Sequence, residues 1–126
     1  MGRRDARAGS STPPIYCINL AASADRRRRM ERRLRHHNLL SRTSFVPAVA
    51  SADLPPGSGG AERAIFLSHV AALEAFLADE PDGSRGAIVC EDDVLLHDEW
   101  HVRLAAVLDN LPRRATLCSS IWASGL

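Results

Sequence analysis

Lysine is missing from this chain of 126 residues, and all sixteen of its basic residues are arginines. The chain therefore lacks the lysine that Schiff-base enzymes and P-loop nucleotide-binding proteins use. The three cysteines, Cys17, Cys90 and Cys118, contain no Cys-x-x-Cys pair, which excludes a zinc ribbon and a thioredoxin-like redox motif. Each cysteine lies in an apolar stretch, so we expect reduced thiols that are buried as small hydrophobic side chains.

Long apolar runs and an export signal are also missing. No stretch is apolar enough over sufficient length to cross a bilayer as a helix. Residues 1–13 are polar and basic, so we interpret them as a flexible leader rather than a secretory signal. The formal charge of +1 gives no general attraction to nucleic acids or anionic membranes. With 45% hydrophobic residues, the sequence predicts a cytoplasmic globular domain without a transmembrane segment.

Strand-like and helix-like patterns alternate along the rest of the chain. Short apolar runs bounded by turn residues predict strands; they are 15–20, 43–49, 87–90 and 116–122. Apolar residues spaced three and four apart predict helices between them; these are 24–38, 62–77 and 98–111. The order predicts an α/β protein with a mainly parallel sheet of about four strands and flanking helices. Pro47 has no N–H group, so the second strand is expected to lie at an edge or to end there.

Three consecutive acidic residues, Glu91, Asp92 and Asp93, follow the third predicted strand. Ligands of open α/β sheets bind at the carboxyl ends of the strands, where these residues are expected to lie. Side chains alternate along an extended segment, so Glu91 and Asp93 should share one face and Asp92 the other. Clustered carboxylates suit a hard cation such as Mg²⁺ or Mn²⁺, bound together with substrate phosphates. A solvated acidic turn is the alternative.

An arginine run, Arg26 to Arg29, opens the first predicted helix directly after Asp25. This helix follows the first strand, so its N-terminus is expected at the same edge of the sheet as the acidic residues. Arginine at a helix N-terminus suits an anionic group, above all a diphosphate. Seven arginines between Arg26 and Arg35 cannot all face one site, so most should form a solvated surface. A nucleic-acid patch is the other interpretation, but interleaved aromatic residues for base stacking are lacking.

His97, His101 and His69 have simple structural explanations. His97 and His101 are four residues apart, but Asp98 stands where a zinc-protease motif needs glutamate, so we expect a pair on the surface. Ser68 and His69 are neighbours in the second predicted helix and cannot face each other as a hydrolytic dyad. A buried, hydrogen-bonded His69 is the usual explanation, and contact with a ligand is the other.

Four blocks in this order resemble glycosyltransferase family 25, which includes lipooligosaccharide galactosyltransferases and relatives of collagen galactosyltransferases. The blocks are Ile18-Asn19-Leu20 with Asp25-Arg26, Phe45-Val46-Pro47-Ala48-Val49, Phe66-Leu67-Ser68-His69-Val70-Ala71-Ala72-Leu73-Glu74 and Ala87-Ile88-Val89-Cys90-Glu91-Asp92-Asp93-Val94. Their order and spacing agree with the family over about residues 14–112. Ala64-Ile65 departs from the Gly-Cys usual in the family at this place.

The resemblance implies a GT-A-like (Rossmann-like) fold and inverting transfer of a sugar, commonly galactose from UDP-galactose, with metal assistance. By position, Asp92 and Asp93 match the family's metal- and diphosphate-binding carboxylates. The donor-binding positions carried over are Asn19, Asp25, Arg26, Ser68, His69 and Glu91. The implied partners are a UDP-sugar and a glycan or lipooligosaccharide acceptor, without nucleic acid. The implied setting is lipopolysaccharide biosynthesis, in the cytoplasm or peripherally at the inner membrane.

The region from 14 to 112 is therefore expected to be the nucleotide-sugar-binding portion of a larger domain. Residues 113–126 have no counterpart in the family and are expected to be divergent or truncated. An inverting transfer needs a general base, and no residue of this chain can be nominated, so we expect little turnover. The alternative is a non-catalytic remnant that binds nucleotide weakly or not at all. A receiver domain is excluded, because it needs a lysine and an acidic pair after its first strand.

Overall fold

The computed structural model describes residues 12–81 and 86–110. The chain divides into two compact units, Met1–Val94 and Leu95–Leu126, and each is described by itself. In the second unit the described part contains one helix, α4 (Trp100–Asn110), within the predicted range 98–111. The predicted strand at 116–122 lies outside the described residues. The sheet and the candidate site belong to the first unit.

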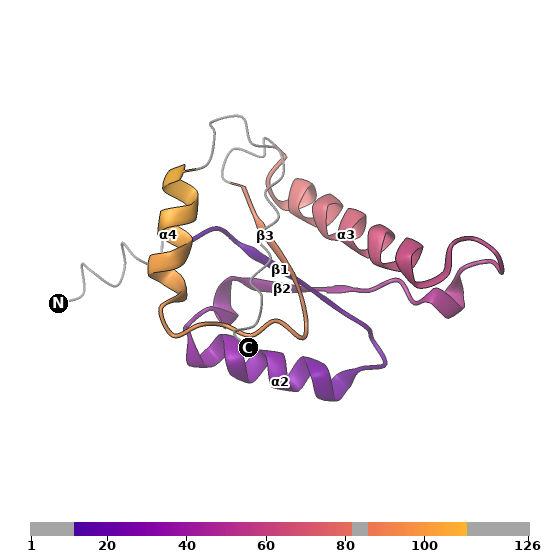
Figure 1. Cartoon of the computed structure of the whole chain (residues 1–126), viewed down its shortest axis with the longest axis horizontal. Helices are drawn as coiled ribbons and strands as arrows, with labels where there is room; N and C mark the ends of the chain where they lie inside the picture. The colour runs from indigo at the N-terminus through magenta and orange to yellow at the C-terminus, as the bar shows by residue number, and fades with distance from the viewer. Residues whose placement is uncertain (1–11, 82–85, 111–126) are drawn as a thin grey trace. The chain divides into compact units, whose positions relative to one another are not determined.

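A parallel three-stranded sheet forms the centre of the first unit (Figure 1). Its strands are β1 (Ile15–Asn19), β2 (Thr43–Pro47) and β3 (Ile88–Glu91). Their order is β2-β1-β3, and Ile15 pairs with Thr43 on one side and Ile88 on the other. The predicted α/β class and parallel sheet are confirmed, with three strands among the described residues where about four were expected for the whole chain.

The central strand β1 is buried along its whole length. Its side chains alternate between the two faces of the sheet, so a strand covered on both faces must be apolar almost throughout. Helix α3 (Gly60–Asp79) packs on one face, and helix α2 (Ala24–His36) lies on the opposite side (Figure 1). This two-sided covering explains the nearly unbroken apolar run that predicted the strand.

The core between the sheet and α3 combines aromatic residues with alanines. Tyr16 and Ile18 of β1 form one cluster with Val46 of β2 and with Ala72 and Phe76 of α3. The rings of Tyr16 and Phe76 meet edge to face, with centroids 5.9 Å apart. The small side chain of Ala72, which is fully buried, lets the helix approach the strands closely.

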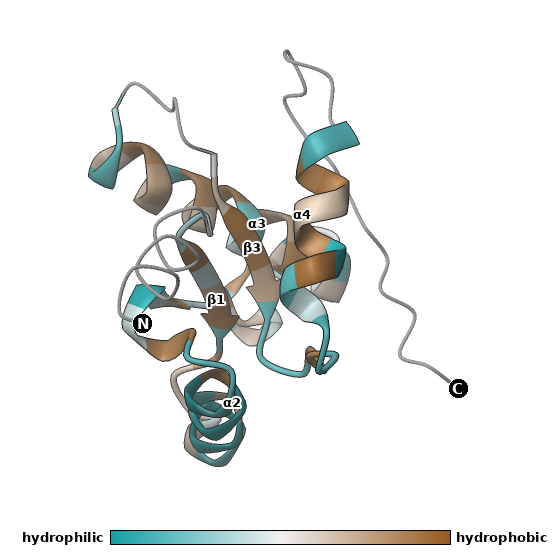
Figure 2. Ribbon diagram, turned by 90° about the vertical axis from the view of Figure 1, so that its left-hand side faces the viewer, coloured by the Kyte–Doolittle hydropathy of each residue, from teal (hydrophilic) through white to brown (hydrophobic). Residues whose placement is uncertain are grey.

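Helix α2 is a hydrophilic surface helix with a narrow buried stripe (Figure 2). Its buried residues are Met30 and Leu34, as predicted from their spacing. The helix ends at His36, two residues before the predicted end, because Asn38 adopts a left-handed conformation with φ of 58°. The amide of Leu39 then donates to the carbonyl of Leu34 and closes the helix end at 2.7 Å.

The segments after β2 position α3. Strand β2 ends at Pro47 and lies at an edge of the sheet that the described strands form, in agreement with the missing N–H group. Two short 3₁₀ helices, η1 (Leu40–Arg42) and η2 (Ser51–Asp53), flank this strand in the chain. Gly59 precedes α3 with φ of 101°, a conformation that favours glycine. Among the described residues, no helix is long and apolar enough to span a membrane.

Candidate functional site at the ends of β1 and β3

The order of the strands in the sheet reverses beside β1. From β1 the chain passes through α2 to β2 on one side, whereas α3 leads to β3 on the other side. The order therefore reverses between β1 and β3, and open α/β sheets bind their ligands at such a reversal. Asn19 ends β1, and Asp92 directly follows β3.

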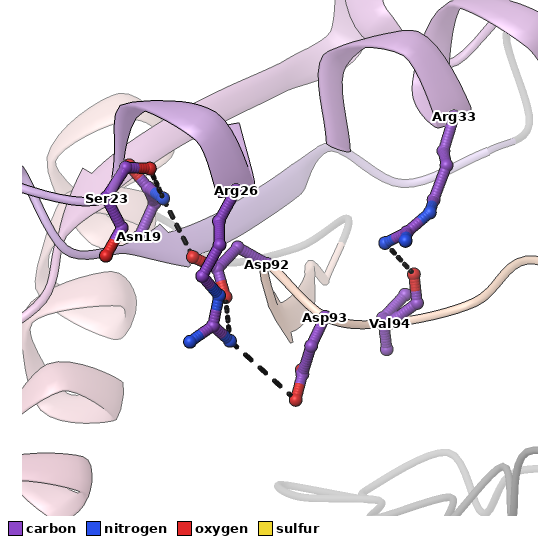
Figure 3. Close-up of polar contacts among 7 residues, drawn as sticks. All are labelled: Asn19, Ser23, Arg26, Arg33, Asp92, Asp93 and Val94. Carbon is purple, nitrogen blue, oxygen red and sulfur yellow. Dashed lines mark hydrogen bonds and ion pairs between the residues drawn. The ribbon is translucent and has the colours of Figure 1, made fainter. Parts of the chain in front are cut away.

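A buried hydrogen bond connects these two strand ends (Figure 3). The amide Nδ2 of Asn19 donates to Oδ2 of Asp92 at 2.8 Å and to the carbonyl oxygen of Ser23 at 3.3 Å. Asn19 and Asp92 are 6% and 7% exposed, so the amide satisfies a carboxylate oxygen that has little access to water. The side chain of Asp92 is thus held in one orientation by a residue from the neighbouring strand.

Arg26 completes this cluster from the first turn of α2. Its Nη2 lies 2.7 Å from Oδ1 of Asp92 and 3.9 Å from Oδ2 of Asp93 (Figure 3). The Asp92 side chain is 8% exposed, whereas those of Arg26 and Asp93 are 47% and 68% exposed. The guanidinium therefore neutralises a buried carboxylate on one side and faces solvent on the other.

An open cleft of about 320 Å³ adjoins the cluster. This volume is at the lower end of the range for small-molecule sites, which is about 300–1,000 Å³. The cleft is lined by the strand ends, by residues 48–52 after β2 and by the start of α3. Five of the predicted site residues meet in its wall; they are Arg26, Ser68, Glu91, Asp92 and Asp93.

The burial of the acidic triplet alternates as its sequence predicted, although Asp92 and Asp93 lie in a turn and not in an extended segment. Asp92 is buried and turned toward Asn19 and Arg26, while Glu91 and Asp93 are exposed. All three nevertheless contribute to the wall of the cleft. The alternation therefore gives the three carboxylates different environments without removing any of them from the site.

The remaining predicted residues lie elsewhere. Asp25 is exposed and forms an ion pair with Arg28, one turn further along α2. His69 is half-buried, and the described wall of the cleft includes its neighbour Ser68 but not His69 itself. Three of the six predicted donor-binding residues line the cleft; they are Arg26, Ser68 and Glu91. Asn19 is linked to the cleft only through its hydrogen bond to Asp92, and Asp25 and His69 do not line it.

Ser68 is a structural part of the cleft wall. Its hydroxyl donates to the carbonyl of Ala64 at 2.7 Å and accepts the amide of Val49 at 2.9 Å. The residue is 3% exposed. Ser68 thus ties α3 to the segment that follows β2, and its hydroxyl is engaged within the protein.

Sequence reasoning missed the segment from Ala48 to Ala52 as a part of the site. This segment follows the carboxyl end of β2, so the strand-end rule that selected Asn19 and Asp92 could also have selected it. A second missed contact is that from Arg33 Nη1 to the carbonyl oxygen of Val94, at 3.3 Å (Figure 3). This hydrogen bond connects α2 to the chain just after the acidic residues, and no local sequence pattern predicted it.

The carboxylates fit a hard divalent cation by their chemistry. Glu91 and Asp93 present exposed oxygens at the cleft, and such oxygens are typical ligands of Mg²⁺ and Mn²⁺. Asp92 directs its oxygens to Asn19 and Arg26, so a cation at Asp92 competes with the Arg26 guanidinium. A cation held by Asp92 and Asp93 would therefore have to displace part of the Arg26 ion pair.

Comparison with known proteins finds no matching family model, curated protein or solved structure. The interpretation of the cleft therefore depends on its residues and their geometry.

Proposed function

We propose that this chain is the donor-binding portion of a glycosyltransferase resembling family 25. Its reaction would transfer a sugar, galactose by the resemblance, from a UDP-sugar to a hydroxyl of a glycan or lipooligosaccharide. The observation that carries the proposal is the buried Asn19–Asp92 hydrogen bond, which Arg26 joins beside a cleft at the strand-order reversal.

Arg26 supports the binding of a diphosphate. Its guanidinium has five N–H donors, and the Asp92 and Asp93 contacts both use Nη2, so other donors remain on the half-exposed side. Guanidinium groups bind phosphate oxygens in a bidentate manner. The first turn of α2 adds the positive end of the helix dipole, and the Asp92 ion pair orients the side chain before any ligand binds.

Asp92 and Asp93 are the residues that would hold a divalent cation. Such an ion, when bound, neutralises negative charge on the departing diphosphate. Asn19 supports this role by fixing the orientation of the Asp92 carboxylate. Glu91 lies beside them in the cleft wall.

The proposed acceptor is a glycan or glycolipid hydroxyl, reached in the cytoplasm or at the inner membrane surface. Deprotonation of that hydroxyl needs a general base. None of the described residues is assigned this role. We therefore expect donor binding with little turnover from this chain.

Thermal unfolding of the full chain with UDP and Mn²⁺ tests donor binding. A ligand that binds only the native state stabilises it by about 2.7 kcal/mol at a hundred times its Kd. We expect UDP and Mn²⁺ together to raise the Tm by more than the sum of their separate effects. Asp93→Asn should abolish the metal-dependent part, because it removes a charged ligand. Glu74→Gln, an equal charge change at an exposed position on α3, should retain it.

The non-catalytic remnant is the second candidate, and one contact favours it. Asp92 has both carboxylate oxygens engaged by Asn19 and Arg26, an arrangement that a purely structural cluster would also have. An unchanged Tm with UDP and Mn²⁺, in the wild type as in Asp93→Asn, would support the remnant and overturn the proposal. Robust sugar transfer from UDP-galactose would contradict the expected lack of turnover.

A further inference from the structure

Two cysteines face each other across neighbouring strands. Cys17 of β1 and Cys90 of β3 are register partners in the parallel pair. Adjacent strands lie about 4.7–4.9 Å apart, which falls within the roughly 4.4–6.8 Å between Cα atoms that a disulfide spans. Both cysteines are free thiols in the structure. The strand register therefore places the two cysteines beside each other on one face of the sheet without any local sequence motif.

The surroundings of the two thiols differ. Cys17 is fully buried in the central strand, whereas Cys90 is partly accessible on β3, an outer strand of the described sheet. A small oxidant from solvent therefore reaches Cys90 first and finds Cys17 as its neighbour. The neighbouring Cys90 side chain and burial raise the pKa of Cys17, so Cys90 and not Cys17 is the first thiol to react.

The cysteine pair is also close in sequence to the candidate site on both strands. Cys17 precedes Asn19 by two residues, and Cys90 precedes Asp92 by two residues. Cys17 and Asn19 are two apart in β1 and share a face of the sheet. The cysteine pair is therefore the neighbour, along the two chains, of the hydrogen-bonded pair Asn19 and Asp92. A covalent bond between the thiols would link the two strands just below the ends that carry the site.

We propose that Cys17 and Cys90 form a peroxide-sensitive dithiol, which peroxides oxidise to a disulfide between β1 and β3. In the first step, the Cys90 sulfur attacks a peroxide oxygen and the O–O bond breaks. This gives Cys90 sulfenic acid and, with the thiol proton, one molecule of water. In the second step, the Cys17 sulfur attacks the Cys90 sulfur and the S–O bond breaks. The leaving hydroxide takes the Cys17 proton and forms a second water, so two thiols lose two electrons and hydrogen peroxide gains them.

The inference is independent of nucleotide binding, and the full chain carrying Cys118→Ser tests it. The protein is treated with hydrogen peroxide and then unfolded in guanidinium chloride, so that iodoacetamide reaches every remaining thiol. Its proteolytic peptides are then mapped by mass spectrometry. We expect a peptide pair linking Cys17 to Cys90 within one chain, and loss of both alkylatable thiols. Dithiothreitol should restore both thiols.

Two further variants define the order of the steps. With Cys90→Ser we expect Cys17 to stay reduced, because Cys17 alone is shielded from solvent. With Cys17→Ala we expect Cys90 to stop at the sulfenic acid, which dimedone traps. If Cys17→Ala does not fold, the peptide map of the Cys118→Ser chain decides by itself. Both thiols still alkylatable after peroxide, Cys90 sulfinic acid without the link, or a link found only between two chains would each overturn the proposal.

Discussion

At the scale of the residue, the environment of a carboxylate decides what it can do. Glu91, Asp92 and Asp93 are chemically similar and consecutive, yet one is buried in an ion pair and two are exposed. The period of an extended segment predicted this division, although Asp92 and Asp93 lie in the turn after β3. It could not identify Asn19 as the partner of Asp92, because the two residues are 73 positions apart and meet only through the strand order.

Tyr16 gives a residue-scale prediction of pH dependence. Burial and the hydrogen bond from its hydroxyl to Asp79, at 2.7 Å, raise the pKa of Tyr16 from 10.0 to about 12. Because the folded state has the higher pKa, the stabilisation is fully present below pH 10 and is lost as the pH rises through about 12. Tyr16→Phe should lower the free energy of unfolding at neutral pH by about 1 kcal/mol. Urea unfolding at several pH values measures both effects.

The comparison of wild type and Tyr16→Phe isolates this group. Their difference in unfolding free energy should be constant up to pH 10 and shrink toward about pH 12. A difference that stays constant over this whole range would show that Tyr16 is not the group responsible.

At the scale of the element, each helix has a different relation to the site. Helix α2 was predicted as a surface helix with Met30 and Leu34 as its inner side, and this is confirmed. Its first turn supplies Arg26 to the cleft, while most of its other arginines are exposed. Helix α3 contributes a wall of small residues, among them Ala61, Ala64 and Ser68. The period of a helix predicts an inner face, but which element covers that face depends on the fold.

Ser68 gives an element-scale prediction. Ser68→Ala removes the acceptor of the Val49 amide, which the hydroxyl holds at 2.9 Å. The loss of this tie between α3 and the segment after β2 should lower the free energy of unfolding by about 1–3 kcal/mol. Ser41→Ala, at an exposed position of η1, is the matched control and should change it by less than about 0.5 kcal/mol. Equal effects of the two substitutions, measured by urea unfolding, would contradict the structural role of Ser68.

At the scale of the whole molecule, the first unit is organised around one strand. β1 is paired on both sides and covered on both faces, whereas β2 and β3 each have one neighbour among the described strands. The ends of β1 and β3 carry the candidate site, so the most buried strand also supports its chemistry. This arrangement explains how a small sheet can hold a charged cluster in a fixed geometry.

Native-state hydrogen exchange tests this organisation. The amides of β1 should exchange most slowly, at rates set by global unfolding, because releasing them requires both strand pairs to separate. The amides of β2 and β3 should exchange faster, through local opening at the sheet edges. Exchange from β1 that is as fast as exchange from both edge strands would show that β1 is not the centre of stability.

The local patterns in the sequence predicted most of the elements. The three strands and three helices of the described residues lie at or within about two residues of their predicted places, and Pro47 ends β2 as expected. Helix α3 is two residues longer at each end than predicted, and α2 ends two residues early because Asn38 adopts a left-handed conformation. Such patterns are reliable because apolar spacing and turn residues act over a few neighbouring positions.

The sequence by itself determined the α/β class, the parallel sheet and the place of Asp92 after a strand. Only the tertiary structure decided that Asn19 and Arg26 hold Asp92, that Cys17 faces Cys90, and that Asp25 and His69 lie away from the cleft. The physical reason is the range of the interactions. Periodicity is a property of neighbouring residues, whereas these contacts depend on the order and register of strands that are far apart in the chain.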